Sequence, residues 1–282
     1  MAEALVNTTE MRIRPVRRAN ANSVYVFADS YLVSHRRRHG LWWGYAHEDS
    51  TIDMRPHQTQ DQIGQQHTAR TINFSRGGLK LVDIASGHDH GVTSARRRWA
   101  NNVPAVTVLA LGACDLNNTY LSGLAITELR TAYPRYVMRQ IQDFMYQARR
   151  ASSNTQIFDA RVAHHRFLIC EPANWGVEYE PRGDLSPEEY RQRCTRAQCG
   201  LQRKRRLLWD NYSASVFSCS PNSMVRRGWT RNHLDAPSQE AFVGELITAV
   251  QCLLCDTCTP QVEFYDKEHE RHHLANFTCR RI

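Results

Sequence analysis

The sequence lacks long apolar runs, and it has few lysines. No segment approaches the roughly 18 consecutive apolar residues of a membrane-spanning helix, so the sequence predicts no membrane span. Residues 1–20 lack the apolar core of a signal peptide, and we therefore expect an intracellular protein, cytoplasmic or nuclear. Because disulfides are rare in those compartments, the nine cysteines are expected to be reduced thiols.

Arginine supplies almost all of the positive charge. The 36 basic residues include three lysines, and the net charge is +8. Arginine suits phosphate and carboxylate recognition, but skewed codon usage gives the same excess without any function. The basic runs at 36–38, 96–98, 203–206 and 226–227 are spread along the chain, and we expect them to be solvated helix faces. No nucleic-acid-binding motif accompanies them, so a nucleic-acid-associated role is the least supported alternative.

Length and composition favour one globular domain with terminal additions. The 282 residues are 41% hydrophobic and 23% charged, which excludes a wholly disordered chain. Residues 1–20 carry four arginines around a proline and predict a basic flexible arm. We expect residues 21–254 to form the domain and residues 255–282 to form a Cys- and His-containing tail.

Short apolar runs alternate with helical patterns along the domain. Strands are predicted at residues 23–28, 71–75, 104–111, 166–170 and 214–219. Helices are predicted at 31–38, at 79–85, from Pro134, from Pro187 to about 209 and at 237–254, with a loop over 41–68. This alternation is typical of βαβ units. It predicts a three-layer α/β/α sandwich with a five-stranded, mainly parallel, flavodoxin-like sheet.

Polar residues and glycines follow the predicted strands. In open parallel sheets, ligands bind beyond the carboxyl ends of the strands. Ser30 follows the first strand, the pair Gly77-Gly78 the second, Cys114 the third, and His233 the fifth. A nucleophile, backbone N–H donors and a base are the groups that acyl transfer needs.

The order of these segments resembles the SGNH (GDSL-type) hydrolase family over residues 21–254. VYVFADSYL is similar to the first block, which presents the serine nucleophile in Gly-Asp-Ser, and NFSRGGLKLVD is similar to the second. VTVLALGACDL resembles the third block, Gly-x-Asn-Asp, and TRNHLDAPSQEAFVGEL the fifth, Asp-x-x-His. The resemblance implies Ser30 as nucleophile and His233 as general base, with an ester or acylated small molecule as substrate. It implies oxyanion stabilisation by the backbone of Gly78, or of Gly77 beside it.

The sequence departs from the family pattern at three positions. Ala28 replaces the first glycine, Cys114 stands at the place of the oxyanion asparagine, and Thr230 stands at the place of the orienting aspartate. Loss of one oxyanion donor costs about 10²–10³ in turnover, and loss of an orienting aspartate about 10⁴ in a serine protease. Asp29 and Asp115 match the family and are expected to support the site.

Two interpretations therefore stay open. The first is a serine ester or acyl hydrolase with weak or lost activity, in which Ser30 and His233 act as a dyad. The second is a catalytically inactive binding or interaction module with the same fold. Cys114 is expected to be a small buried residue with a weak S–H donor rather than a reactive thiol.

The C-terminal tail holds a cluster of metal-ligand residue types. Its candidates are Cys255, Cys258, His269 and His273, whose spacing approaches a zinc-finger pattern. The segment between the two pairs is shorter than the usual dozen or so residues, so we favour an incidental cluster over structural zinc and expect no cofactor. His88, Asp89 and His90 also resemble a metal site, but they are expected in a Gly-rich loop and are less favoured still.

Overall fold

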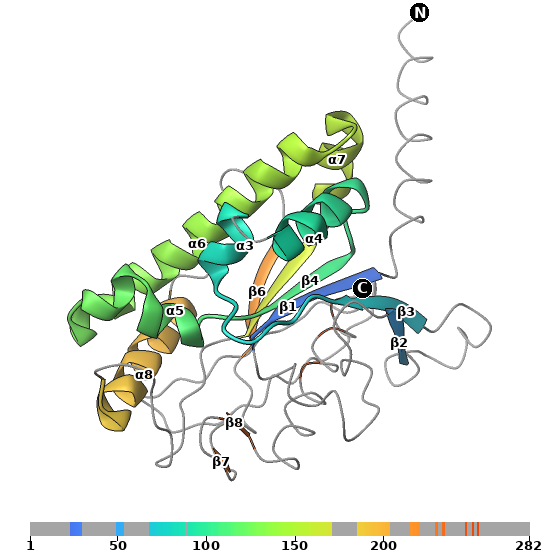
Figure 1. Cartoon of the computed structure of the whole chain (residues 1–282). Helices are drawn as coiled ribbons and strands as arrows, with labels where there is room; N and C mark the ends of the chain where they lie inside the picture. Colours follow the sequence, from blue (N-terminus) through green and yellow to red (C-terminus); the bar gives the residue numbers. More distant parts are fainter. Residues whose placement is uncertain are drawn as a thin grey trace, which may run out of the picture.

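The described residues form a six-stranded sheet, with strand order β2-β3-β1-β4-β5-β6 (Figure 1), and a separate two-stranded sheet. The computed structural model describes residues 23–29, 49–53, 68–87, 90–170, 185–203, 215–219, 229–230 and 233–234, and positions 246, 250 and 253. The strands are β1 (Ser23–Ala28), β2 (Asp49–Asp53), β3 (Thr68–Asn73), β4 (Val106–Ala110), β5 (Arg166–Cys170) and β6 (Ser215–Cys219). All neighbouring pairs are parallel except β2 with β3.

The five predicted strands are confirmed, but the predicted loop over 41–68 is wrong in part. Residues 49–53 form β2, an antiparallel edge strand, and β3 begins at Thr68 rather than at 71. The β2 sequence, DSTID, contains two aspartates and little apolar alternation, which is why it gave no strand signal. An edge strand has a neighbour on one side, so polar residues are tolerated there.

Seven helical segments connect the described strands. They are α3 (Leu81–Ser86), α4 (His90–Asn101), α5 (Ala113–Asn118), η4 (Tyr120–Gly123), α6 (Ile126–Ala151), α7 (Thr155–Val162) and α8 (Pro187–Arg203). Helices α4, α5 and α7 and the short helix η4 were not predicted. In α4 the buried residues Val92, Ala95 and Trp99 have helical spacing. Three consecutive arginines lie among them in the sequence, so the apolar pattern was not recognised. The predicted helix at 31–38 lies outside the described residues.

Helices cover both faces of the sheet. Figure 1 shows α3, α4 and α6 side by side over the strands. The chain crosses from β3 past β1 to β4, and then to β5 and β6, in one direction, so right-handed crossovers place α4, α6 and α8 on one face. On that face Phe27 of β1 and Phe167 of β5 contact Phe144 of α6, with ring centroids 5.9 and 6.3 Å apart.

The opposite face is closed by the last helical segment. Arg166 precedes Phe167 on β5, so its side chain points to the other face, where it donates to the Leu253 carbonyl. Leu246, Val250 and Leu253 are helical and buried, at the spacing of one helix face. The predicted three-layer α/β/α fold is therefore present.

Helix α6 begins at Ile126, so the predicted start near Pro134 is wrong. Its first turn is capped by Glu128, whose carboxylate accepts from the Ala125 N–H at 2.8 Å. Leu129 and Tyr133 are buried and extend the apolar stripe in front of the proline. The predicted inward residues of this helix are confirmed as buried: Val137, Ile141, Phe144, Met145 and Ala148.

Helix α8 begins at the predicted capping box and buries the predicted residues. The Ser186 hydroxyl accepts from the Glu189 N–H at 3.2 Å. The inward set Tyr190, Cys194, Ala197 and Leu201 is buried.

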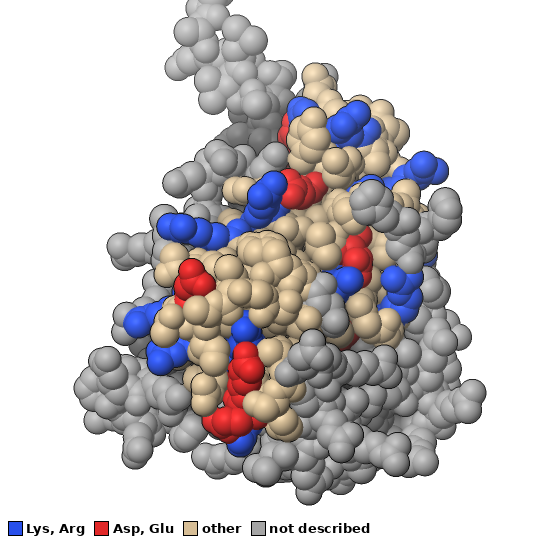
Figure 2. Space-filling model, turned by 60° about the vertical axis from the view of Figure 1, so that its left-hand side comes forward, with Lys and Arg blue, Asp and Glu red and all other residues tan. Residues whose placement is uncertain are grey.

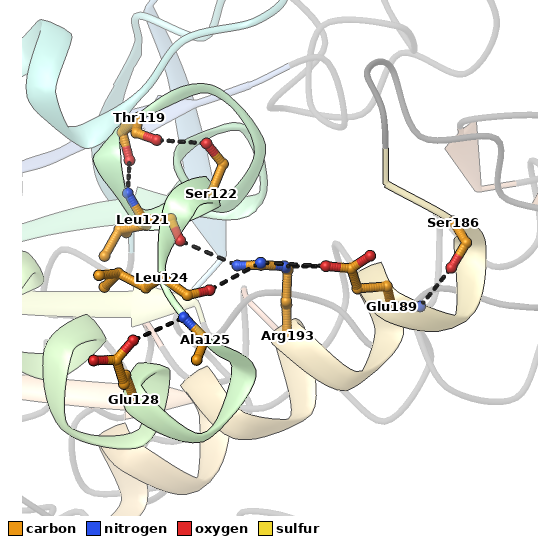
Figure 3. A network of polar contacts seen from close by, with 9 residues as sticks. All are labelled: Thr119, Leu121, Ser122, Leu124, Ala125, Glu128, Ser186, Glu189 and Arg193. Carbon is orange, nitrogen blue, oxygen red and sulfur yellow. Dashed lines mark hydrogen bonds and ion pairs between the residues drawn. The ribbon is translucent and has the colours of Figure 1, made fainter.

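Arg193 joins α8 to the segment that follows α5 (Figure 3). Its guanidinium donates to the carbonyls of Leu121 and Leu124 at 3.1 and 2.9 Å, and it pairs with Glu189 at 3.3 Å. The side chain of Arg193 is 5% exposed. This contact fixes the segment after α5 against α8.

Charges of both signs share the face of the molecule that Figure 2 shows, where basic and acidic side chains are interspersed. Arg97 and Arg98 are exposed as expected, but Arg96 is buried and donates to the Ala85 carbonyl at 2.8 Å, at the end of α3. That arginine is thus a helix-capping residue and not part of a solvated face. Within the described part of the chain, no helix has the length and apolarity to cross a membrane.

Candidate active site

Strand order brings three of the predicted site segments to one edge of the sheet. β1 lies between β3 and β4, so the segments after these strands are neighbours. The Arg76 N–H, just before Gly77-Gly78, donates to the Ala28 carbonyl at 2.9 Å. On the other side, the Asp29 N–H donates to the Ala110 carbonyl at 3.4 Å. The structure therefore places Asp29, the glycine pair and the Cys114 segment together.

Gly77 and Gly78 form an exposed turn between two anchored residues. The Leu79 N–H closes the turn by donating to the Arg76 carbonyl at 3.1 Å, and the Leu79 side chain is buried. Gly78 has φ of +73°, a conformation that L side chains rarely adopt, and a Cβ there would meet nothing within 4 Å. The N–H groups of both glycines make no hydrogen bond with other described residues. Such solvent-facing N–H groups suit an anion.

Gly112 starts helix α5 with φ of +116°, which explains the glycine of the third segment. The Leu116 N–H donates back to the Gly112 carbonyl at 3.1 Å. Cys114 and Asp115 therefore sit in the first turn of a short helix, directly after β4.

The Cys114 thiol faces Asp29. Its Sγ atom donates to Asp29 Oδ2 at 4.0 Å, and the side chain is half-buried. Burial, together with the carboxylates of Asp29 and Asp115, raises the pKa of this thiol to about 12. Cys114 is therefore a neutral, weak donor at physiological pH and not a nucleophile.

Asp115 is buried and is held by groups from two other elements. Its two carboxylate oxygens accept from the Leu81 N–H of α3 at 3.1 and 3.0 Å, and the Tyr136 hydroxyl of α6 donates to Oδ1. Burial raises its pKa to about 6, against the hydrogen bonds from Tyr136, Leu81 and Val82, which lower it. The carboxylate is thus mostly ionised at neutral pH.

The sequence did not predict the roles of Tyr136 and Leu81. Tyr136 lies next to the predicted inward stripe of α6, and Leu81 contributes through its backbone, which no side-chain pattern can indicate.

Ser30 and the side chain of His233 lie outside the described residues. The His233 backbone belongs to β8 (His233–Leu234), which pairs antiparallel with β7 (Trp229–Thr230). Thr230 and His233 are register partners in this pair. The predicted orienting position and the predicted base therefore lie opposite each other in a two-stranded ribbon.

The candidate metal ligands are only partly covered by the structure. Cys255, Cys258, His269, His273, His88 and Asp89 lie outside the described residues. His90 begins helix α4, so the loop expected around it ends there. Within the described ranges, no group of three or more His, Cys, Asp or Glu side chains is arranged to hold a metal ion.

In comparisons with known proteins, this chain is similar to solved structures. No protein-family profile matches the sequence. No curated protein matches it either. One similar solved structure is the psychrotrophic esterase EstA from Pseudoalteromonas sp., inhibited by monoethylphosphonate; it is 12% identical, with a TM-score of 0.41 over 82% of this chain and 97% of the esterase. Another is TesA, which is 14% identical, with a TM-score of 0.40 over 82% of this chain and 99% of that chain.

Proposed function

We propose that this chain is an SGNH-like serine ester or acyl hydrolase with weakened catalytic machinery. The observation that carries the proposal is the meeting of three family-like segments at the ends of neighbouring strands. Asp29 follows β1, Gly77-Gly78 follows β3, and Cys114 lies in the first turn after β4. The hydrogen bonds from Arg76 to Ala28 and from Asp29 to Ala110 join them.

In the proposed reaction, Ser30 Oγ attacks the carbonyl carbon of an ester while His233 takes its proton. The tetrahedral oxyanion is stabilised by the backbone N–H groups of Gly78 and Ser30. Collapse breaks the ester C–O bond, and His233 returns the proton to the leaving alcohol. Water then hydrolyses the acyl-serine by the same steps, with His233 again as base.

Two substitutions lead us to expect weak activity. In the family an asparagine amide supplies an oxyanion donor, whereas here the Cys114 thiol donates to Asp29. Thr230 stands where an acid would orient His233, and threonine carries no charge to stabilise an imidazolium. Removal of either group costs orders of magnitude in turnover, about 10² or more each in other hydrolases.

The contact between Cys114 and Asp29 also favours a second candidate function. A donor that is already bonded to a buried carboxylate does not contribute to an oxyanion hole, as expected of a catalytically inactive binding module. In that case the three segments would hold an ester or acylated ligand without cleaving it.

Labelling with a serine-directed fluorophosphonate separates the two functions. For the hydrolase we expect slow, stoichiometric labelling that Ser30→Ala abolishes and His233→Gln slows. We expect Gly78→Ala to slow labelling more than Gly77→Ala, because Gly78 has a positive φ, which alanine adopts only with strain, and Gly77 does not. No labelling of the folded wild-type chain contradicts the hydrolase and supports the binding module.

A further inference from the structure

The Gly77-Gly78 turn is tied to the rest of the domain on both sides. On its N-terminal side, the Arg76 N–H donates to the Ala28 carbonyl of β1 at 2.9 Å. On its C-terminal side, the Leu81 N–H lies 3.1 and 3.0 Å from the two oxygens of Asp115. Leu81 opens helix α3, and its N–H has no partner within that helix, as in any first turn. A tertiary carboxylate supplies that partner here.

Burial of the Asp115 carboxylate at this position costs free energy of folding. Its carboxylate is fully buried, and burial is the largest influence on its pKa, which is raised despite three hydrogen-bond donors. A neutral side chain would cost less to bury. What the carboxylate supplies is a pair of oxygens that accept from the Leu81 N–H while the Tyr136 hydroxyl fixes their orientation.

We infer that Asp115 is a positioning residue that, through the Leu81 N–H, sets the place of the Gly78 N–H at the oxyanion site. The inference rests on the proposed function for its catalytic meaning. Leu81 follows Gly78 by three residues, and the intervening Leu79 is buried, so a shift at Leu81 moves the turn. A misplacement of about 1 Å at a reacting group costs about 10² in rate.

Hydrogen exchange in Asp115→Ala and Asp115→Asn tests the structural half of this inference. In Asp115→Ala we expect the amides of residues 77–82 to exchange about tenfold faster or more, because the acceptor of the Leu81 N–H is lost. In Asp115→Asn one side-chain oxygen still accepts that N–H and the amide donates to the Tyr136 hydroxyl, so exchange should stay closer to wild type than in Asp115→Ala. Residues 137–148 of α6 should be unaffected in both variants. Unchanged exchange at 77–82 in Asp115→Ala overturns the inference.

Tyr136→Phe replaces Asp115→Ala if that variant does not fold. Loss of the hydroxyl loosens the carboxylate, so the same amides should exchange faster than in the matched variant Tyr133→Phe. Equal exchange in the two phenylalanine variants overturns the inference.

Kinetics with an aryl ester, and the rate of fluorophosphonate labelling, test the catalytic half. We expect Asp115→Ala to lower turnover and labelling by about 10–100-fold, with KM changed less than about threefold, and Asp115→Asn to restore both. If the wild type reacts and Asp115→Ala reacts equally fast, the positioning role is overturned while the proposed function stands. If the folded wild type does not react, the proposed function fails, and exchange at 77–82 alone decides whether Asp115 holds the turn.

Discussion

The rings of Tyr133 and Tyr136 stack on helix α6 with centroids 6.4 Å apart, but their hydroxyls differ in surroundings. The Tyr136 hydroxyl donates to the buried carboxylate of Asp115. The Tyr133 hydroxyl is fully buried and has no hydrogen-bond partner among the described residues. Two chemically identical groups one turn apart therefore make opposite contributions to the free energy of unfolding.

Removal of each hydroxyl should show this difference. We expect Tyr136→Phe to lower the free energy of unfolding by about 1.5–3 kcal/mol, because a hydrogen bond to a charged group is lost. Tyr133→Phe should be neutral or stabilising, since it removes a buried polar atom without a partner. Urea unfolding at pH 7.5 measures both. Equal losses in the two variants would contradict the assignment of the bond to Tyr136.

Gly200→Ala should destabilise the packing of α8 on α6. A Cβ at position 200 would overlap the Arg130 carbonyl oxygen and lie 3.0 Å from Pro134 Cγ. That carbonyl is the one that Pro134, without an N–H, leaves unpaired within α6. Overpacking of this kind costs about 1–3 kcal/mol, and the helix propensity gained by alanine offsets up to about 1 kcal/mol.

Gly123→Ala is the matched control for this variant. A Cβ at position 123 would meet nothing within 4 Å, and its φ is not positive. Thermal unfolding should therefore give a lower midpoint for Gly200→Ala than for Gly123→Ala, and the reverse order would show that the helices separate easily.

His165 should make the domain less stable in acid. Its Nδ1–H donates to the Pro104 carbonyl at 2.6 Å, its Nε2 has no partner among the described residues, and burial lowers its pKa to about 3. The unfolded chain, with a histidine pKa near 6.5, binds the proton more readily, so stability is lost as pH falls from about 6.5 towards 3. The full effect is on the order of a few kcal/mol.

His165→Asn should flatten this dependence, because its amide can donate to Pro104 and does not titrate. The exposed neighbour His164 gives the control variant, His164→Asn. Asp115, whose pKa is raised to about 6, contributes a slope of opposite sign between its two pKa values, so the informative quantity is each variant's curve relative to wild type. Parallel curves for wild type and His165→Asn would contradict the prediction.

Restoration of the two missing groups should raise activity. In Cys114→Asn with Thr230→Asp, an amide donor and an orienting carboxylate return to the family positions, so turnover on an aryl ester should rise about 10²-fold or more. The gain should be absent when Ser30→Ala is added. A wild type that is already fast, and that Ser30→Ala inactivates, would show that neither group is needed.

The sequence predicted the features that apolar runs and glycines encode. Buried strands such as Val106–Ala110 are continuous apolar segments, and the pair Gly77-Gly78 does follow a strand, as expected. Polar elements were missed, because β2 is an edge strand and three arginines interrupt the pattern of α4. The hydrogen bond between the Leu81 N–H and Asp115 joins residues 34 positions apart. Because its donor is a backbone N–H, the residue type at position 81 could not predict it.

The position of β1 in the sheet also determines when both of its hydrogen-bonding edges can be paired during synthesis. Among the described strands of the six-stranded sheet it is the first along the chain, yet it lies between β3 and β4, and Val24 pairs with both Thr71 and Val106. Until β4 has emerged from the ribosome, this strand of buried Val, Tyr and Phe has an open hydrogen-bonding edge. A nascent chain that stalls before residue 106 therefore exposes an aggregation-prone strand, and a chaperone that binds extended apolar segments would find its target there.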